Sequence, residues 1–123
     1  MKLGDAISRL DELKPNGFSR GQKIFWLSAL DSTVKEEIID RHEGAETLSF
    51  APYDEQSAED TELLVPSPYD EVYLRYMEAQ IDYANGEYDR FNNSNAMYAA
   101  AYTAFARAYN RTHMPLTGSR KYY

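Results

Sequence analysis

The sequence predicts a mainly α fold, a small bundle of about four helices, and three observations support this prediction. Apolar side chains recur three and four residues apart in four separate segments, which is the spacing of one face of an α-helix. Prolines and glycine-containing turns separate these segments, where helices are expected to stop. The chain has 123 residues and no cysteine, so it can form one domain with a modest core but no disulfide framework.

The beginning of the chain predicts a helical hairpin. Leu3, Ile7 and Leu10 lie on one helical face, and the first helix must end by Lys14 because Pro15 disfavours helix at the residue before it. A hairpin of this kind could bind DNA, but its second helix offers acidic side chains where a DNA-binding helix would carry Arg or Lys. These acidic residues are Asp31, Glu36, Glu37 and Asp40.

The second helix is predicted to begin at Ser19, after a turn at residues 16–17. Ser19 and Gln22 have the spacing of a capping box, which satisfies backbone N–H groups at a helix start. The helix is expected to run to about His42, with Gly44 as its C-terminal stop. Its predicted apolar face comprises Ile24, Leu27, Leu30, Val34 and Ile38, with Trp26 and Ile39 at the margins.

Two short extended segments, residues 47–50 and 62–65, are a candidate β-hairpin inserted between the second and third helices. The loop between them is acidic, with Asp54, Glu55, Glu59, Asp60 and Glu62. Its charge resembles that of a calcium loop, but the central glycine and the regular alternation of ligands are missing. We therefore expect a solvated loop, with no metal and no cofactor.

The third helix is predicted from residue 68 to about Asn85. Ser67 is placed as its N-cap, Pro68 at its first helical position, and Asp70 closes a capping box. The predicted core side comprises Val72, Tyr73, Tyr76, Met77, Ile81 and Ala84. The predicted outward acidic residues are Glu71, Glu78 and Asp82.

The fourth helix, residues 87–111, follows a break at residues 85–86 and is expected to fold back antiparallel on the third. One face carries a row at heptad spacing, here called the aromatic row: Tyr88, Phe91, Asn95, Tyr98, Tyr102, Phe105 and Tyr109. Alanines flank this row, so another backbone could approach it closely. The row is either the core side of an ordinary amphipathic helix or a face that contacts another subunit.

Two residues of this helix carry separate expectations. A buried Asn95 within the aromatic row would fix the register of helix association, whereas a frayed start would leave the regular helix beginning at Ser94. If the Tyr102 ring is core, Tyr102→Ala should cost about 3–5 kcal/mol.

Charge is distributed unevenly along the chain. Residues 36–89 hold sixteen acidic and two basic side chains, whereas residues 90–123 hold five basic and no acidic ones. Acidic loops that merely keep the protein soluble would explain this, as would docking of one copy's basic end on its neighbour's acidic part. The acidic excess argues against ordinary nucleic-acid binding, because phosphate contacts need clustered Lys and Arg.

The end of the chain lacks helical periodicity. We expect one domain over residues 1–115 and a flexible C-terminal tail over residues 116–123. The tail ends in a combination of cations and rings that is suited to ordering on a partner: Arg120, Lys121, Tyr122 and Tyr123.

Catalytic patterns are absent from the sequence, and we expect no enzyme and no catalytic residues. The only histidines are His42 and His113, and no Gly-rich phosphate loop or nucleophile elbow is present. No apolar run approaches the roughly 18 residues of a membrane span, and the first ten residues carry charge. These features predict an intracellular, soluble protein that binds no membrane.

Three segments carry a resemblance to a known family: residues 60–71 (DTELLVPSPYDE), 78–88 (EAQIDYANGEY) and 109–115 (YNRTHMP). They resemble small proteins encoded in the head-gene clusters of tailed phages and prophages of Gram-positive bacteria. Those proteins are taken to be head-tail connector, or adaptor, proteins of the small helical type that sits beneath the portal. The resemblance extends from the first helix to Pro115, and its motifs include no catalytic residues.

The resemblance implies a structural virion protein that is assembled in the host bacterial cytoplasm and located at the head-tail junction. The implied assembly is a closed ring of about twelve copies, which contacts the portal on one side and a stopper or tail-completion protein on the other. DNA would pass through the ring without sequence-specific binding. The residue-level hypothesis is that Glu71, Glu78 and Asp82 face this lumen, where acidic groups repel the phosphate backbone.

Two other functions remain open from the residues. An acidic interaction module, such as a DNA mimic or an antitoxin-like inhibitor, would use its carboxylates to imitate phosphates and would need a basic protein partner. A small metal-dependent hydrolase built on the carboxylate-rich loop would be stabilised by metal, but the sequence offers no ligand spacing for it.

Overall fold

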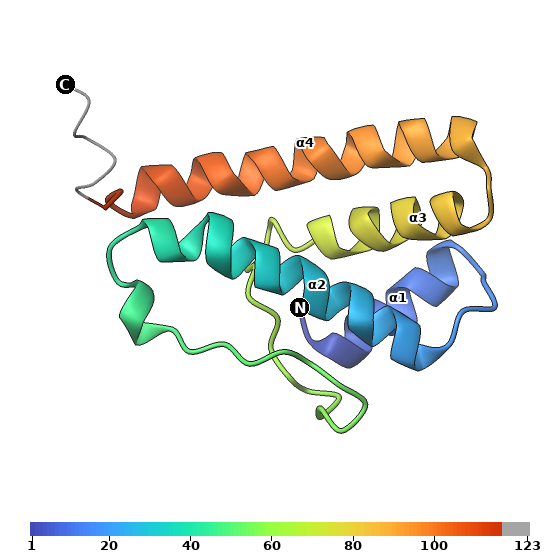
Figure 1. Ribbon diagram of the computed structural model, residues 1–123, viewed down its shortest axis with the longest axis horizontal. Helices are drawn as coiled ribbons and strands as arrows, with labels where there is room; N and C mark the ends of the chain where they lie inside the picture. Colours follow the sequence, from blue (N-terminus) through green and yellow to red (C-terminus); the bar gives the residue numbers. More distant parts are fainter. Residues whose placement is uncertain (117–123) are drawn as a thin grey trace.

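The computed structural model describes residues 1–116 and confirms the mainly helical bundle. Figure 1 shows α3 and α4 side by side and antiparallel, with α1 and α2 packed beneath them and a long irregular loop below α2. The most extensive contact between two helices joins α3 and α4. The elements are α1 (Leu3–Leu13), α2 (Arg20–Glu37), the 3₁₀ helices η1 (Ile39–Arg41) and η2 (Ala45–Thr47), α3 (Val72–Ala84) and α4 (Tyr88–Thr112).

The predicted end of α1 and the predicted start of α2 are confirmed. The backbone N–H of Lys14 closes α1 on the Leu10 carbonyl at 2.8 Å. The Asn16 side chain then forms the turn, since it accepts from the N–H of Phe18 at 3.0 Å. Ser19 is the N-cap of α2, and its hydroxyl accepts from the Gln22 N–H at 3.1 Å.

Helix α2 ends at Glu37, several residues before the predicted end near His42. The reason is a competing bond, because the Ile38 carbonyl faces the His42 ring Nδ1 at 2.6 Å. The backbone N–H of His42 bonds the Ile39 carbonyl instead, in the tighter pattern of η1. Gly44 therefore does not stop α2; it has a φ of 91° and precedes η2.

The predicted β-hairpin is wrong. Residues 47–50 and 62–65 do not pair, and residues 1–116 contain only two isolated β-bridges, Lys2 with Glu62 and His42 with Pro115. The segment around residue 62 instead runs beside the start of the chain, where Leu63 N–H donates to the Met1 carbonyl at 3.0 Å. These backbone groups are thus satisfied by a partner far away in sequence.

Helix α3 begins at Val72, four residues after the predicted start, and Ser67 is not its cap. Residues 66–71 form successive turns, in which Tyr69 N–H bonds the Pro66 carbonyl at 2.9 Å. The N–H of Val65 donates to the Tyr73 hydroxyl at 2.7 Å. This bond holds the backbone at Val65 against the side of α3.

Helices α1 to α3 build the core, and α4 covers it from one side. The predicted apolar face of α2 is buried as expected, and so are Val72, Tyr73, Met77 and Ile81 of α3, whereas Ala84 is exposed and Tyr76 is half-buried. Of the 25 residues of α4, only Phe105 and Ala108 are buried. The largest fully buried side chains are Tyr73, Leu3, Leu10, Ile24, Leu27, Leu30, Leu74, Met77, Ile81, Val34, Val65 and Val72.

Candidate functional site

The aromatic row of α4 packs within the subunit along most of its length. Phe105 is buried, Tyr88 is 61% exposed, and the rings of Phe91, Tyr98, Tyr102 and Tyr109 are half-buried. Tyr98 contacts Tyr76 of α3 with ring centroids 5.1 Å apart. Burial raises the pKa of Tyr98 to about 12, with smaller contributions from Tyr76 and Glu37. The row is therefore the face on which α4 rests.

The expectation of a buried Asn95 is wrong, because Asn95 is exposed. Its neighbour Ser94 faces α3 instead and donates to Asp82 Oδ2 at 2.9 Å. The heptad pattern therefore slips by one residue at this turn. Helix α4 is nevertheless regular from Tyr88, so the start of the helix is not frayed.

The predicted outward position of Asp82 is also wrong. Asp82 is 2% exposed, and its Oδ1 lies 2.8 Å from Lys14 Nζ. Together with the bond from Ser94, this ion pair joins the end of α1, α3 and the first part of α4. A buried carboxylate needs such partners, so Asp82 serves the packing of three helices and does not line any surface.

Glu71 and Glu78 do lie at the surface of α3, but they share one cation. Arg75 Nη1 is 3.0 Å from Glu78 Oε1, and Arg75 Nη2 pairs with Glu71. Arg75 neutralises much of their charge locally, so α3 does not present a face of three free carboxylates.

Tyr102 provides a test of how α4 rests on the core. Its hydroxyl donates to Glu37 Oε1 at 2.7 Å, and its ring is only half-buried. We therefore expect Tyr102→Ala to lower the free energy of unfolding by about 1–2 kcal/mol, less than for a fully buried ring. Urea denaturation would measure this. Tyr102→Phe, which removes only the hydroxyl, is the control and should cost under about 1 kcal/mol, whereas a loss above about 3 kcal/mol for Tyr102→Ala would contradict the half-buried packing.

Asp31 of α2, one of the acidic side chains that argue against DNA binding, is a buried carboxylate. Asp31 is 0% exposed. It accepts from the hydroxyls of Tyr53 and Tyr73, each at 2.6 Å, and from the Leu64 N–H at 3.0 Å. Since Asp31 follows Leu27 by four residues and precedes Val34 by three, helical spacing could have placed it on the apolar face. Asp31 thereby fixes the long loop to α2 and α3.

Burial raises the pKa of Asp31, although its three hydrogen bonds oppose this effect. A carboxyl with a raised folded-state pKa stabilises the fold fully below its ordinary pKa of about 4, and this contribution is lost as the pH rises through the folded-state value. We therefore expect the stability of the wild type relative to Asp31→Asn to fall as pH rises above about 4. Urea denaturation of both proteins at several pH values above about 4 would measure this difference in stability. A stability of the wild type relative to Asp31→Asn that rises with pH would contradict the prediction.

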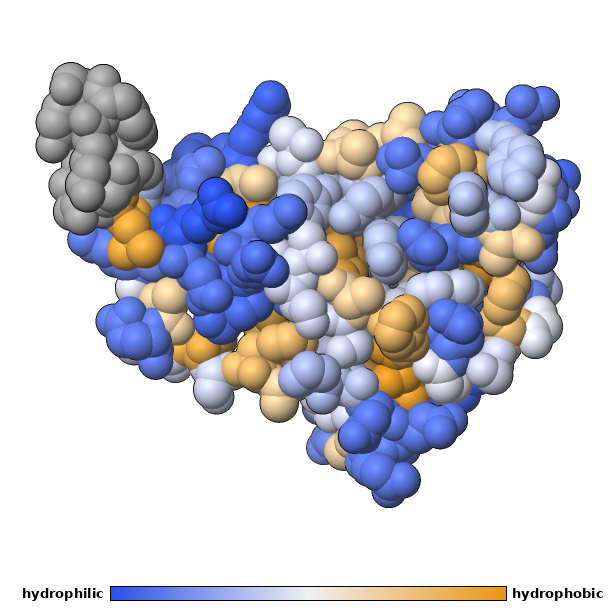
Figure 2. Space-filling view, in the orientation of Figure 1, coloured by the Kyte–Doolittle hydropathy of each residue, from blue (hydrophilic) through white to orange (hydrophobic). Residues whose placement is uncertain are grey.

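The acidic loop between Tyr53 and Thr61 is anchored to the first turns of α1 and α2. Gly4 N–H donates to the Glu59 carbonyl at 2.9 Å, and Arg20 Nη2 lies 2.8 Å from Glu59 Oε1. The Glu55 carboxylate rests on Gly21, where a Cβ would lie only 2.7 Å from it. Figure 2 shows hydrophilic side chains over the tip of this loop.

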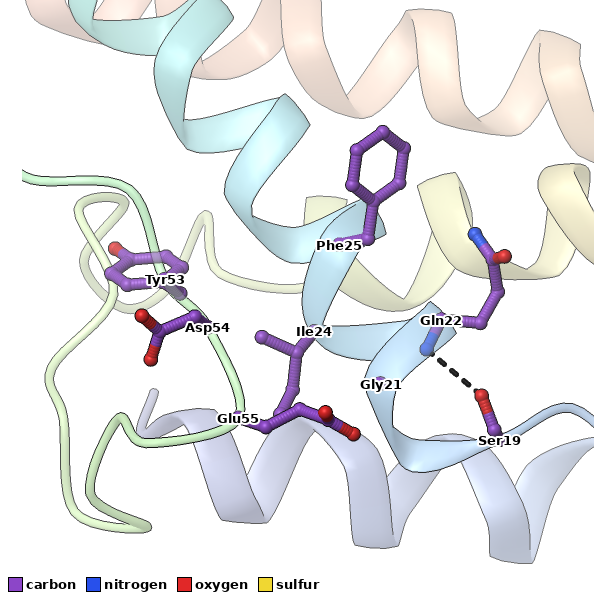
Figure 3. A pocket seen from close by; sticks show the side chains of 8 residues that line it. All are labelled: Ser19, Gly21, Gln22, Ile24, Phe25, Tyr53, Asp54 and Glu55. Carbon is purple, nitrogen blue, oxygen red and sulfur yellow. Dashed lines mark hydrogen bonds between the residues drawn. The ribbon is translucent and has the colours of Figure 1, made fainter.

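A pocket of about 420 Å³ lies between this loop and the start of α2 (Figure 3). At its rim, the Phe25 ring points away from the loop and is 65% exposed. Asp54 and Glu55 are exposed on the other side. Within residues 1–116, no group of three or more His, Asp or Glu side chains is arranged to hold a metal ion. The pocket is lined by Ser19, Gly21, Gln22, Ile24, Phe25, Tyr53, Asp54 and Glu55.

A second concavity, here called the α4-end groove, has a volume of about 280 Å³. Aromatic rings build it: Phe105 lies 6.1 Å from Tyr69 and 5.7 Å from Tyr109 between centroids, and His113 stacks on Tyr109 at 3.8 Å. Arg111 adds an exposed cation. The groove is lined by Pro66, Ser67, Tyr69, Phe105, Ala108, Tyr109, Arg111, Thr112 and His113.

The outer face of α4 is exposed along its length, and none of the other elements in residues 1–116 covers it. It carries small and polar residues with one large apolar side chain, Met97, which is 51% exposed. Arg107 and Arg111 have no carboxylate within ion-pair distance among the described residues. Exposed positions of α4 outside the aromatic row include Asn92, Asn93, Ala96, Met97, Ala99, Ala100, Thr103, Ala104, Arg107, Asn110 and Arg111.

The chain after α4 folds back on the corner after α2. Glu43 N–H donates to the Met114 carbonyl at 2.8 Å, and Leu116 N–H donates to the Arg41 carbonyl at 3.0 Å. His42 Nε2 lies 2.5 Å from Asn110 Oδ1, which adds a link to α4. The predicted partner-docking residues Arg120, Lys121, Tyr122 and Tyr123 lie outside the described residues.

The fold and these surfaces define a small helical-bundle protein with several surface concavities and a face of α4 that no other element of residues 1–116 covers. No family model, curated protein or solved structure matches the chain. In the described part of the chain, no helix combines the length and apolar character that crossing a membrane requires.

Proposed function

We propose that this protein is a head-tail connector subunit of a tailed phage or prophage, which forms a ring of about twelve copies between the portal and a stopper or tail-completion protein. The observation that carries the proposal is the separation of unlike surfaces on one subunit. The acidic loop and the basic, uncovered α4 lie at opposite edges in Figure 1. Head-to-tail contacts close into a ring only when two different patches of neighbouring subunits meet, and this subunit offers such patches.

Charge also supports passage of DNA through such a ring. A channel that DNA slides through should avoid tight phosphate contacts, and exposed carboxylates repel the backbone. Of the three predicted lumen residues, Asp82 is buried, whereas Glu71 and Glu78 remain at the surface and are partly neutralised by Arg75. An exposed acid of the loop, Asp60, is a further candidate. A cryo-EM map of the assembled ring that places Glu71 and Glu78 on its outer surface would overturn the hypothesis for these two residues.

The exposed acidic loop also suits the alternative of an acidic inhibitor that docks on a basic protein. One experiment separates the two functions: the mass of the purified protein, alone and mixed with a portal ring from the same genome, by native mass spectrometry or light scattering. A connector should bind the portal ring in about twelve copies. If the protein is a monomer or dimer and does not bind the portal ring, the connector function is wrong and the acidic inhibitor remains as the alternative.

A further inference from the structure

We infer that neighbouring copies contact each other by inserting Phe25 of one subunit into the α4-end groove of the next. Asp54 and Glu55, which line the same pocket as Phe25 on its other side, would face Arg111 at the groove. This inference rests on the proposed function and names the surfaces that would join the ring. The three residues Phe25, Asp54 and Glu55 are here called the acidic knob.

The groove has the chemistry to receive an aromatic side chain flanked by acids. Its walls are the rings of Tyr69, Phe105 and Tyr109, which favour edge-to-face or stacked contact with a further ring. Arg111 is exposed beside these walls, and no described carboxylate neutralises it. A ring that enters between these walls would therefore bring any acid beside it close to an unpaired cation.

The acidic knob has the complementary composition. Phe25 is 65% exposed although it is a large apolar side chain, and Figure 3 shows its ring projecting away from the subunit's own loop. A single exposed ring is ordinary on a protein surface. Here, however, Asp54 and Glu55 line the same pocket and are exposed without an ion pair among the described residues. Ring and carboxylates together match the rings and cation of the groove.

Geometry requires the two surfaces to meet between subunits. Figure 1 shows the start of α2, which carries Phe25, at the opposite end of the molecule from the end of α4, which carries the groove. One copy therefore cannot fill its own groove with its own knob. A contact between unlike patches is heterologous, and repeated with a fixed rotation it closes into a ring.

Charge reversal tests the contact without disturbing the fold, because both residues are exposed. Glu55→Arg and Arg111→Glu should each weaken self-association by about tenfold or more, since like charges would then face each other. The double variant, and an equimolar mixture of the two single variants, should assemble as the wild type does. In both cases every knob again meets a groove of opposite charge.

The control variants Glu12→Arg and Arg90→Glu make the same charge changes at exposed positions away from the knob and the groove, and they should assemble normally. Phe25→Ala should also weaken association by about tenfold while leaving the melting midpoint unchanged, because the ring is exposed. The readout is oligomer mass against concentration by light scattering, alone and on the portal ring, with a melting curve for each variant.

The outcomes are distinguishable. Assembly of the wild type together with normal assembly of Glu55→Arg, Arg111→Glu and Phe25→Ala would overturn this contact and leave the connector function standing. If the wild type does not self-associate, either alone or on the portal, both the contact and the connector function are wrong. Rescue by the double variant would support the knob and groove specifically, since a general electrostatic effect would also move the controls.

Discussion

Replacing Asp31 by alanine should lower the free energy of unfolding by about 3 kcal/mol, because three hydrogen-bond donors would lose their buried acceptor. Two of these donors are the hydroxyls of Tyr53 and Tyr73, and the third is the Leu64 N–H. Each unsatisfied buried donor costs about 1–3 kcal/mol, and relief from burying the carboxylate offsets part of the total. Urea denaturation monitored by circular dichroism would measure the change.

The tyrosine partners provide matched controls for this prediction. Tyr73→Phe should cost more than Tyr53→Phe, because the Tyr73 hydroxyl also accepts from the Val65 N–H at 2.7 Å. Tyr53 is half-buried, so water can replace part of its bond. An Asp31→Ala protein as stable as the wild type would mean that the network contributes specificity without net stability.

Truncating Leu27 should be similarly costly, at about 3–4 kcal/mol for Leu27→Ala. Leu27 is 0% exposed at the centre of the core that α1, α2 and α3 form, so its loss would leave a cavity. The matched control is Met97→Ala on the outer face of α4, where the side chain is 51% exposed. That change should cost under about 0.5 kcal/mol in the monomer. Similar decreases in the free energy of unfolding for the two variants would mean that Met97 is buried rather than exposed.

The spacing of apolar residues predicted where the helices lie in the sequence, but not which elements each helix packs against. The face of α2 around Leu27 and Leu30 is buried as its spacing indicates, because a helix must turn its apolar stripe inward. The aromatic row was harder to interpret. Tyr and Phe at heptad spacing indicate a packed face, but spacing does not reveal that α4 lies on one side of a core that the other three helices complete.

Two of the errors have a common physical origin in bonds between residues distant in sequence. The predicted hairpin does not form because the backbone near residue 62 bonds to the start of the chain instead. Asp82 was expected outside, but Lys14 pairs with it from α1. Local propensity is a weak guide where a tertiary partner offers a better-satisfied alternative. The α4-end groove could not be predicted from the sequence either, because it is formed by residues 66–69 together with the distant end of α4.

The pairing of the start of α1 with the loop near residue 60 affects the order in which segments fold. Leu3 N–H needs the Thr61 carbonyl and Gly4 N–H needs the Glu59 carbonyl, each at 2.9 Å. During synthesis, these two N–H groups therefore cannot reach their native partners until residues 59–61 have been made. The first turn of α1 thus reaches its native surroundings later than the contacts formed within α2, and contacts that span such long loops slow folding.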